Sequence, residues 1–449
     1  MTHREEENFE YLKVDPPETQ PQIYSPRSTL SSEARELKST EFQVSMNLFK
    51  VFIGIGVLSL GYGIKEAGLI QANLLMIIGA SFTYWSINIL ITIVETMNIR
   101  IQSFDQLSYH LLGDWGSILT KTCVIILQVG TGVTYVYYFG VFFRNMFCFF
   151  GFDFGCNNFF VSLVLVLFLI IPLHMVRTLT KYWYFSLIAN FLIVFSLLCI
   201  TVYCGYLAHT QGGLRGYNLF DMNYFAAFFG ISIFSIESLS IILEIRDSMK
   251  NPLLFRSIFI RQFSITLLLY TILPTIYYLI LGDSIKEIIL FNIPLENPLG
   301  LIIQTAYGIA LCLSYPLQMY PVFLIIEKFL KKKNTNMLNE DENTHIREKF
   351  YYKIKWISIR ILMCIFLVII AYVIPDFAWF LNVLGAVGST ILGMILPVVL
   401  AEKYFIILGI HKEAYPPLSR YGNLCTMVIG IIGGVLATYY SLDYMIGKP

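Results

Sequence analysis

Charge is scarce in this 449-residue chain. Only 14% of its residues are Asp, Glu, Lys or Arg, against about 25% in an average soluble domain, whereas 56% are hydrophobic. That many apolar side chains cannot all be hidden in one water-soluble core, so lipid must replace water around most of the chain. The net charge of +1 also lacks the basic excess that a nucleic-acid partner requires. Composition therefore predicts a protein embedded in the lipid bilayer that binds no nucleic acid.

Motifs typical of enzymes and of metal sites are missing as well. The chain holds no HExxH, no GxSxG and no cluster of His and Asp, so we expect neither enzymatic activity nor a bound cofactor or metal. None of the eight cysteines forms a CxxC pair, and most lie in apolar runs, where a small buried thiol is common. Cys148 and Cys156 flank a short predicted outer loop, and the sequence leaves open whether they form a disulfide.

The N-terminal segment lacks the apolar stretch of a signal peptide. Residues 1–41 are instead rich in Glu, Pro, Ser and Thr, a composition typical of disordered segments. We therefore predict a disordered cytosolic tail over 1–41 and a membrane domain over 42–446.

Long apolar runs fill the rest of the chain. A helix needs about 20 mostly apolar residues to cross a bilayer. Such runs lie near 45–64, 71–96, 117–149, 159–175, 182–206, 222–245, 254–281, 299–327, 352–374, 378–408 and 422–441. The longest hydrophilic break between them, 328–351, should lie in water. The pattern predicts an all-α membrane protein with about eleven transmembrane helices.

Basic residues give these spans an orientation, because Lys and Arg concentrate in cytosolic loops. With the N-terminus in the cytosol, the cytosolic side holds Arg100, Lys121, Arg177, Lys181, Arg246, Lys250, Arg256, the basic residues of 328–351, Lys403, Lys412 and Arg420. The opposite side holds only Lys65, Arg144, Arg215, Lys286 and Lys448. We therefore expect a cytosolic N-terminus and, because the number of spans is odd, a C-terminus on the extracellular or lumenal side.

Glycine interrupts the first span, where Gly54, Gly56, Gly61 and Gly63 fall within ten residues. Glycine costs about 1 kcal/mol relative to alanine inside a helix. One interpretation is close packing against a neighbouring helix. The other is a discontinuous helix, whose outer half would direct free N–H groups and a positive dipole end at an anion such as a substrate carboxylate.

The sixth span carries a second candidate break. Gly230, Ser232 and Ser235 precede Glu237, a carboxylate inside an apolar run. A charged group at mid-bilayer is costly and suggests a function. Alternatively, Glu237 holds the opened backbone together through hydrogen bonds, and the two roles are compatible.

Interrupted spans at corresponding positions of two halves indicate a five-plus-five inverted repeat with its site at the membrane midplane. Spans one and six are five apart. We therefore predict one repeat over about 45–206, a second over about 222–408 and an additional helix over about 422–441.

Five segments, in the right order, resemble the amino acid/auxin permease family, and within it the proton-coupled amino acid transporter branch. They are Lys50–Gly68 with its Gly-x-Gly and Leu-Ser-Leu, Ile171–Asn190, Phe228–Pro252 with Phe-Ser-Ile-Glu, Ser314–Tyr320 and Leu384–Ser389. The resemblance covers about 42–441. It implies eleven spans, a LeuT-like fold of five plus five helices with one added, and symport of amino acids, usually with protons.

The resemblance also implies substrate contacts in span one. Gly54, Ile55 and Gly56 would offer backbone groups to the carboxylate of the substrate. Ile55 stands where the family often has a small polar residue, which makes this part of the expected pocket more apolar. Tyr135 in span three and Tyr315 in span eight are further candidates to line the cavity.

In span six, the resemblance assigns Gly230, Ser232 and Ser235 to the ammonium group of the substrate, and it places Glu237 beside the unwound segment. One departure concerns the proton. Many members of the branch carry a His where this chain has Asn47, which cannot titrate. Burial raises the pKa of a carboxylate, so Glu237 is the best candidate for the proton-coupling group.

The sequence thus predicts a monomeric secondary transporter of small neutral amino acids, coupled to protons by symport through alternating access. It would lie in the plasma membrane or in a vacuolar or lysosomal membrane. Two alternatives stay open. Sodium could be the coupling ion, held by carbonyls of span one and hydroxyls of span eight such as Ser314. The chain could also be a nutrient sensor that binds an amino acid and signals through its tail and the 328–351 loop.

Overall fold

The computed structural model describes residues 38–447 except 98, 176–182, 212, 217, 222–224, 335–341, 375 and 410–416. Most of the predicted disordered tail, residues 1–37, therefore lies outside the described residues. Its last residues, from 38 on, are described. Thr40 caps the first helix in a capping box with Gln43. Ser39 forms a bridge with Met249, through backbone hydrogen bonds with the segment after span six.

The described chain is helical throughout, apart from that single bridge. The first half contains α3 (Glu41–Phe52), α4 (Val57–Ala67), α5 (Leu69–Thr96), α6 (Phe104–Phe149), α7 (Asp153–Asn157), α8 (Phe159–His174) and α9 (Trp183–Gln211). The second half contains α10 (Phe225–Ile236), α11 (Leu239–Asp247), η1 (Pro252–Leu254), α12 (Phe255–Leu281), η2 (Gly282–Ser284), η3 (Ile289–Asn292), α13 (Pro298–Asn334), α14 (Glu342–Val373), α15 (Phe377–Val383), the π-helical η4 (Leu384–Ser389) and η5 (Ile391–Ile395), α16 (Leu396–Ile407) and α17 (Pro417–Gly447).

Ten helical segments of the described chain are long and apolar enough to cross a membrane. Helix α8 is shorter, at 16 residues, but it is the most apolar run and supplies the eleventh span. Spans one and six are each built from two helices, α3 with α4 and α10 with α11, and span ten runs from α15 to α16. The prediction of about eleven transmembrane helices is confirmed.

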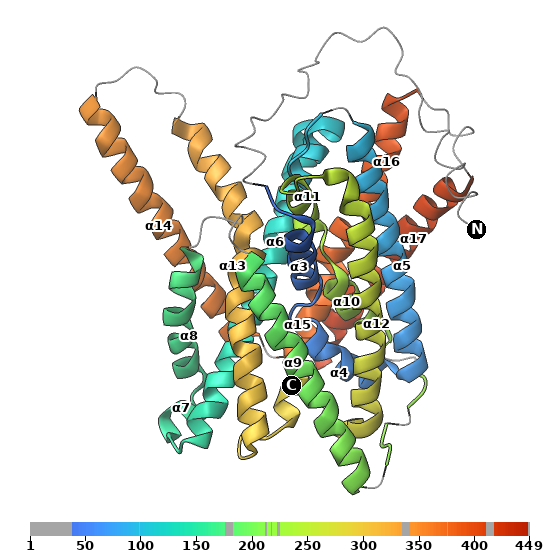
Figure 1. The fold of residues 1–449 in the computed structure, drawn as a ribbon, viewed down its shortest axis with the longest axis vertical. Coiled ribbons are helices and arrows are strands. Elements are labelled where there is room, and N and C mark those ends of the chain that lie inside the picture. The colour runs from blue at the N-terminus through green and yellow to red at the C-terminus, as the bar shows by residue number, and fades with distance from the viewer. Residues whose placement is uncertain are drawn as a thin grey trace.

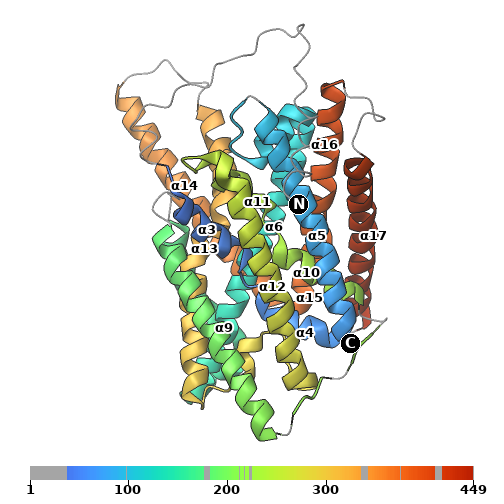
Figure 2. The same ribbon diagram turned by 45° about the vertical axis from the view of Figure 1, so that its right-hand side comes forward.

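Both predicted breaks are present, and both lie in the middle of the bundle. Residues 53–56 separate α3 from α4, and residues 237–238 separate α10 from α11. Figures 1 and 2 show these four short helices surrounded by the longer ones. The outermost helices present apolar side chains to the outside, as in α17, whose Val435 is 63% exposed. Lipid is therefore the natural surrounding of this bundle.

The glycines of span one divide between the two interpretations left open by the sequence. Gly54 and Gly56 lie in the break. Gly61 and Gly63 lie inside α4, where a Cβ would meet Ile285 at 2.7 Å and a phenylalanine of α10 at 2.6 Å. Gly54 and Gly56 therefore open the helix, and Gly61 and Gly63 allow neighbouring side chains to pack closely against α4.

One span begins earlier than predicted. The run 117–149 is part of α6, which starts at Phe104. Gly113, at φ 72° and ψ −157°, breaks the helical geometry and separates a short amphipathic entry segment from the span itself. The left-handed φ favours glycine at this position. The entry segment carries Asp105 and His110, and Asp114 follows Gly113, so a search for long apolar runs does not include this part of the helix.

Candidate functional site

The side of the first break where α4 begins exposes backbone amides. Helix α4 begins at Val57, and among the described residues the N–H groups of Ile55 and Gly56 have no hydrogen-bond acceptor. Both residues are buried or nearly so, since Ile55 is 1% exposed. Free amides at the positive end of a helix dipole attract an anionic group. This end of the break has the polarity expected of a carboxylate site.

The side of the same break where α3 ends has the opposite character, because its carbonyl groups already have donors. Three successive carbonyl oxygens accept a hydrogen bond from a side chain. Tyr270 Oη donates to Phe52 at 2.5 Å, Lys50 Nζ to Ile53 at 2.8 Å, and Tyr307 Oη to Gly54 at 3.0 Å. The donors come from α12, α3 and α13, so three helices fix the carbonyl end of the break.

Glu237 holds the second break. Its carboxylate accepts hydrogen bonds from the N–H group and from the hydroxyl of Ser240, at 3.0 and 3.2 Å. Gln128 of α6 donates to the same hydroxyl at 2.5 Å. Glu237 therefore caps the N-terminus of α11 and is linked through Ser240 to span three. This is the structural role that the sequence left open beside a functional one.

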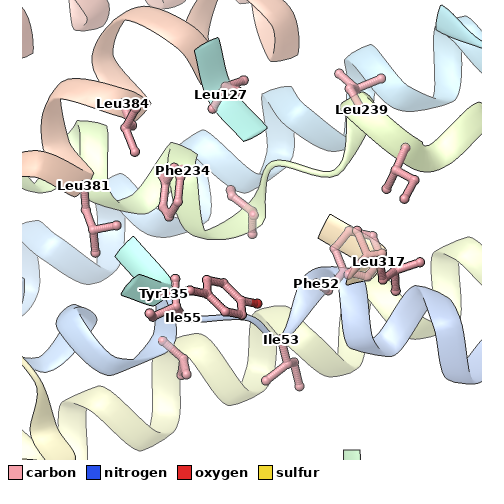
Figure 3. Close-up of a cluster of buried hydrophobic side chains, with 14 of the residues drawn as sticks. Phe52, Ile53, Ile55, Leu127, Tyr135, Phe234, Leu239, Leu317, Leu381 and Leu384 are labelled. Carbon is pink, nitrogen blue, oxygen red and sulfur yellow. The ribbon is translucent and has the colours of Figure 1, made fainter. Parts of the chain in front are cut away.

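The first break touches the last turn of α10, just before the second break. A Cβ on Gly56 would lie 2.5 Å from Ser235 Oγ, so only glycine allows this approach. Tyr135 lies on the same side, with its hydroxyl 4.0 Å from the position of a Cβ on Gly54. In Figure 3, Tyr135 lies beside the segment from Ile53 to Ile55, and the opened chain of span six runs opposite. The structure thus brings these residues of spans one, three and six together.

Two residues assigned to the substrate by resemblance face elsewhere. Gly230 packs against Asn382 and Gly385 of span ten, with no room for a side chain on either glycine. Ser232 lies near Gly79 of α5 and donates to the Phe229 carbonyl of its own helix. Both lie in α10, before its end at Ile236, because span six opens later than the glycine suggested.

Tyr315 is part of a buried polar chain behind Tyr135. The two rings pack edge to face, with centroids 5.8 Å apart. The Tyr315 hydroxyl lies 2.5 Å from Nε2 of His174, and Nδ1 of that imidazole lies 3.2 Å from the Arg360 carbonyl oxygen. The guanidinium of Arg360 in turn donates to the His174 carbonyl and stacks over Trp356. Spans three, four, eight and nine are joined through this chain.

Sequence reasoning missed Lys50, His174, Tyr270 and Tyr307. The importance of Lys50 could have been predicted, because a charged residue inside an apolar run suggests a function, as it did for Glu237. The tyrosines had none, since the chain contains 29 of them. Among the described residues no group of three or more His, Cys, Asp or Glu could hold a metal ion.

A pair of carboxylates lies at the end of the bundle nearest α4. The Glu287 carbonyl accepts the Ser59 hydroxyl of span one at 2.7 Å. Its carboxylate accepts the N–H group of Phe377, at the start of span ten, at 2.8 Å. Burial, followed by the neighbouring Asp376 carboxylate, raises the pKa of Glu287 to about 7. Glu287 therefore connects spans one and ten, to span one through its backbone carbonyl and to span ten through its titratable carboxyl group.

Ion pairs join helices at the other end of the bundle. They are Arg100 with Asp247 (2.7 Å), Arg256 with Glu95 (2.9 Å), and Asp105 with both Lys121 (3.7 Å) and Lys328 (3.6 Å). Arg256 with Glu95 connects spans seven and two, and Arg100, in the segment between spans two and three, pairs with the end of span six. Asp105 and Lys121 both lie in α6, and Lys328 connects span eight to this part of span three.

The family model described as transmembrane amino acid transporter protein matches residues 38–440. The chain belongs to this family. Vacuolar amino acid transporter 4 of Saccharomyces cerevisiae is 29% identical over 374 residues, which cover 79% of this chain and 51% of that protein. Amino acid transporter ANT1 of Arabidopsis thaliana is 24% identical and is covered over 96% of its length, with 95% of this chain.

The yeast relatives are longer. The chain spans about half the length of vacuolar amino acid transporters 4 and 3 of Saccharomyces cerevisiae, at 51% and 56%. Among solved structures, the nucleobase-cation-symport-1 family transporter Mhp1 in a closed conformation matches with a TM-score of 0.56 and 13% identity, over 92% of this chain and 93% of that one. The fold is therefore LeuT-like, and the family is one of transporters rather than enzymes.

Proposed function

We propose that the chain is a secondary active carrier of small neutral amino acids, coupled to protons by symport and located in a vacuolar membrane. The observation that carries this proposal is the meeting of two broken helices at Gly56 and Ser235, with free amides on one side. The relatives, amino acid transporters of vacuoles and plants, support the substrate class and the membrane. One chain supplies both breaks, so we take a monomer as the working unit.

The substrate would lie across the two breaks. Its carboxylate would accept hydrogen bonds from the amides of Ile55 and Gly56, and its ammonium group would approach the Ser235 hydroxyl and the carbonyl end of α10. The side chain of the amino acid would then face Ile55 and Tyr135, which are 1% and 2% exposed. A close apolar and aromatic wall favours small neutral substrates over charged ones, because desolvating a charged side chain against apolar surface is costly.

Alternating access would move spans one, two, six and seven against spans three, four, eight and nine. Arg256 with Glu95 connects spans two and seven within the first group, and Lys328 with Asp105 connects spans three and eight within the second. At the midplane, single hydrogen bonds connect the groups at each break: Tyr307 to the Gly54 carbonyl, and Gln128 to Ser240 beside Glu237. Breaking two such contacts costs far less than unpacking either group, since a net hydrogen bond contributes about 1 kcal/mol.

Glu237 would couple this movement to the proton. As a carboxylate it accepts both bonds from Ser240 and caps α11. Protonation removes the charge that makes the cap strong, so the geometry of the break depends on the proton. Asn47 cannot replace it. With the N-terminus in the cytosol, as the basic residues predict, protons and amino acids would both enter the cytosol from the vacuole.

Uptake into proteoliposomes tests the proposal. We expect labelled glycine, alanine or proline to accumulate only when a proton gradient is imposed. The variant Glu237→Gln should lose this accumulation but retain exchange of internal for external amino acid, because exchange needs no net proton movement. Asp153→Asn, an exposed carboxylate of the outer loop, is the matched control and should behave as the wild type.

Three results would contradict the proposal. Accumulation driven by pH in Glu237→Gln would exclude this residue as the coupling group. Accumulation that ignores the proton gradient would exclude proton symport. Saturable binding of the same amino acids without any flux would instead indicate a sensor.

A further inference from the structure

Lys50 is a buried basic residue at the centre of the membrane domain. Its side chain lies in α3 and the residue is only 2% exposed. Its amino group donates to the carbonyl oxygen of Ile53 at 2.8 Å, at the point where α3 ends and the chain opens. A lysine is almost never fully buried without a partner, because desolvation of its charge is costly. Here the partner is the carbonyl end of a helix, which carries the negative end of the helix dipole.

Carbonyl ends of broken helices are where carriers of this architecture bind coupling cations. In this chain the position has an occupant of its own. We propose that the amino group of Lys50 is a resident cation, which takes the place of a bound metal ion at the carbonyl end of α3 and makes the transport cycle independent of sodium. This inference rests on the proposed function, since it specifies the ion requirement of the same site.

The neighbouring oxygens support the assignment. The carbonyl of Phe52 accepts from Tyr270 and that of Gly54 from Tyr307, and both tyrosines are 1% exposed or less. A sodium ion at this place would need several oxygen ligands at once, and each of the three successive carbonyls already has a donor. Each of the three carbonyls that the sodium alternative requires therefore already accepts a hydrogen bond from the protein itself.

The Ser314 hydroxyl of span eight donates to the carbonyl of Ala310, one turn earlier in α13. Its oxygen keeps its lone pairs, but it is a single ligand, too few to hold a sodium ion without the three carbonyls. The tether of Lys50 is equally local, because it lies three residues before its acceptor in the same half-helix. The charge thus travels with α3 when that half-helix moves, whereas a free ion would have to bind and leave in each cycle.

Sodium dependence of exchange tests the proposal with the purified full chain in proteoliposomes. The probe is labelled alanine, exchanged against internal alanine in sodium chloride or in choline chloride, with no proton gradient. Wild-type exchange should be the same in both salts. Lys50→Met fills the space without a charge and should exchange about tenfold more slowly in both salts, which corresponds to about 1.4 kcal/mol.

Lys50→Ala empties the space and gives the sharper result. It should lose exchange in choline and recover at least part of it in sodium, and sodium should raise its melting temperature but not that of the wild type. Lys65→Ala, at the outer end of the same span and away from the break, is the matched control and should match the wild type in both salts.

Two outcomes would overturn the proposal: wild-type exchange or stability that depends on sodium, and Lys50→Met exchanging as fast as the wild type. The melting temperatures of the wild type and of Lys50→Met in the two salts need no substrate. They therefore remain informative if alanine is not carried, and an absence of all amino-acid exchange would count against the proposed function alone.

Discussion

Replacing Glu287 with glutamine should remove a specific part of the pH dependence of stability. The carboxyl of Glu287 has its pKa raised from 4.5 to about 7, by burial first and by the Asp376 carboxylate second. Between these pH values the native protein holds a proton that the unfolded chain has already released. Stability must therefore fall as the pH rises through this window. The contribution of the protonated group is complete below about pH 4.5 and is lost above about pH 7.

The size of the effect follows from the same two values. A difference between 4.5 and about 7 corresponds to roughly 3 kcal/mol, at 1.36 kcal/mol per pH unit. The side chain is partly exposed, and solvent screening reduces this to about 1–2 kcal/mol. Glutamine imitates the protonated form, because its amide oxygen can still accept the N–H group of Phe377. The variant should thus keep at neutral pH the stability that the wild type has only in acid.

Thermal unfolding of the purified protein between pH 4.5 and 8 measures the difference. Other groups titrate in both proteins, so the quantity of interest is the melting temperature of Glu287→Gln minus that of the wild type. It should rise with pH by ~2 °C or more. Glu296→Gln, an exposed carboxylate of the same outer loop, should show no such rise. Parallel pH profiles for the wild type and Glu287→Gln would refute the reasoning.

Three further predictions concern the breaks and the outer loop. Alanine at Gly56 should slow amino-acid exchange about tenfold or more, because its Cβ would lie 2.5 Å from a serine hydroxyl of α10. Alanine at Gly54 is the control: its Cβ would meet no atom closer than 4.0 Å, so exchange should be unchanged. Tyr307→Phe should slow exchange about tenfold, because a buried carbonyl at the break loses its donor, at about 1–3 kcal/mol. Serine at both Cys148 and Cys156, which form a disulfide, should lower the free energy of unfolding by about 2–3 kcal/mol and leave exchange unchanged.

Each of these predictions has a result that contradicts it. Equal effects of the two alanine substitutions would show that the contact between the breaks is unimportant. Full exchange by Tyr307→Phe would mean that the carbonyl finds another donor. Unfolding of the double serine variant at the wild-type temperature would show that the disulfide adds nothing to stability.

The sequence predicted the fold well because the bilayer imposes simple rules. Eleven apolar runs became eleven spans, since each must be about as long as the membrane is thick. The breaks were predictable for a similar reason. Glycine and carboxylate residues are costly inside a membrane helix, so they indicate positions with a structural or functional role, as at Gly54, Gly56 and Glu237.

The faces of the helices were not predictable in the same way. Gly230 and Ser232 belong to the right span, but only the neighbouring helices decide that one faces span ten and the other α5. The hydrogen bonds of Tyr270 and Tyr307 join segments more than 200 residues apart, and no local pattern distinguishes these tyrosines from the others. Whether Cys148 and Cys156 pair was likewise left open until the loop geometry placed their Cα atoms 4.7 Å apart.

The contact between Gly230 and Gly385 has a mechanical consequence. Two backbones that touch without intervening side chains cannot slide past each other in small steps, since interiors are close-packed. The first half of span six and the π-helical turn of span ten should therefore behave as one rigid lever. When the bundle tilts, span ten must tilt with it. The moving group would then include span ten as well as spans one, two, six and seven. A bulkier residue at either glycine should block the movement.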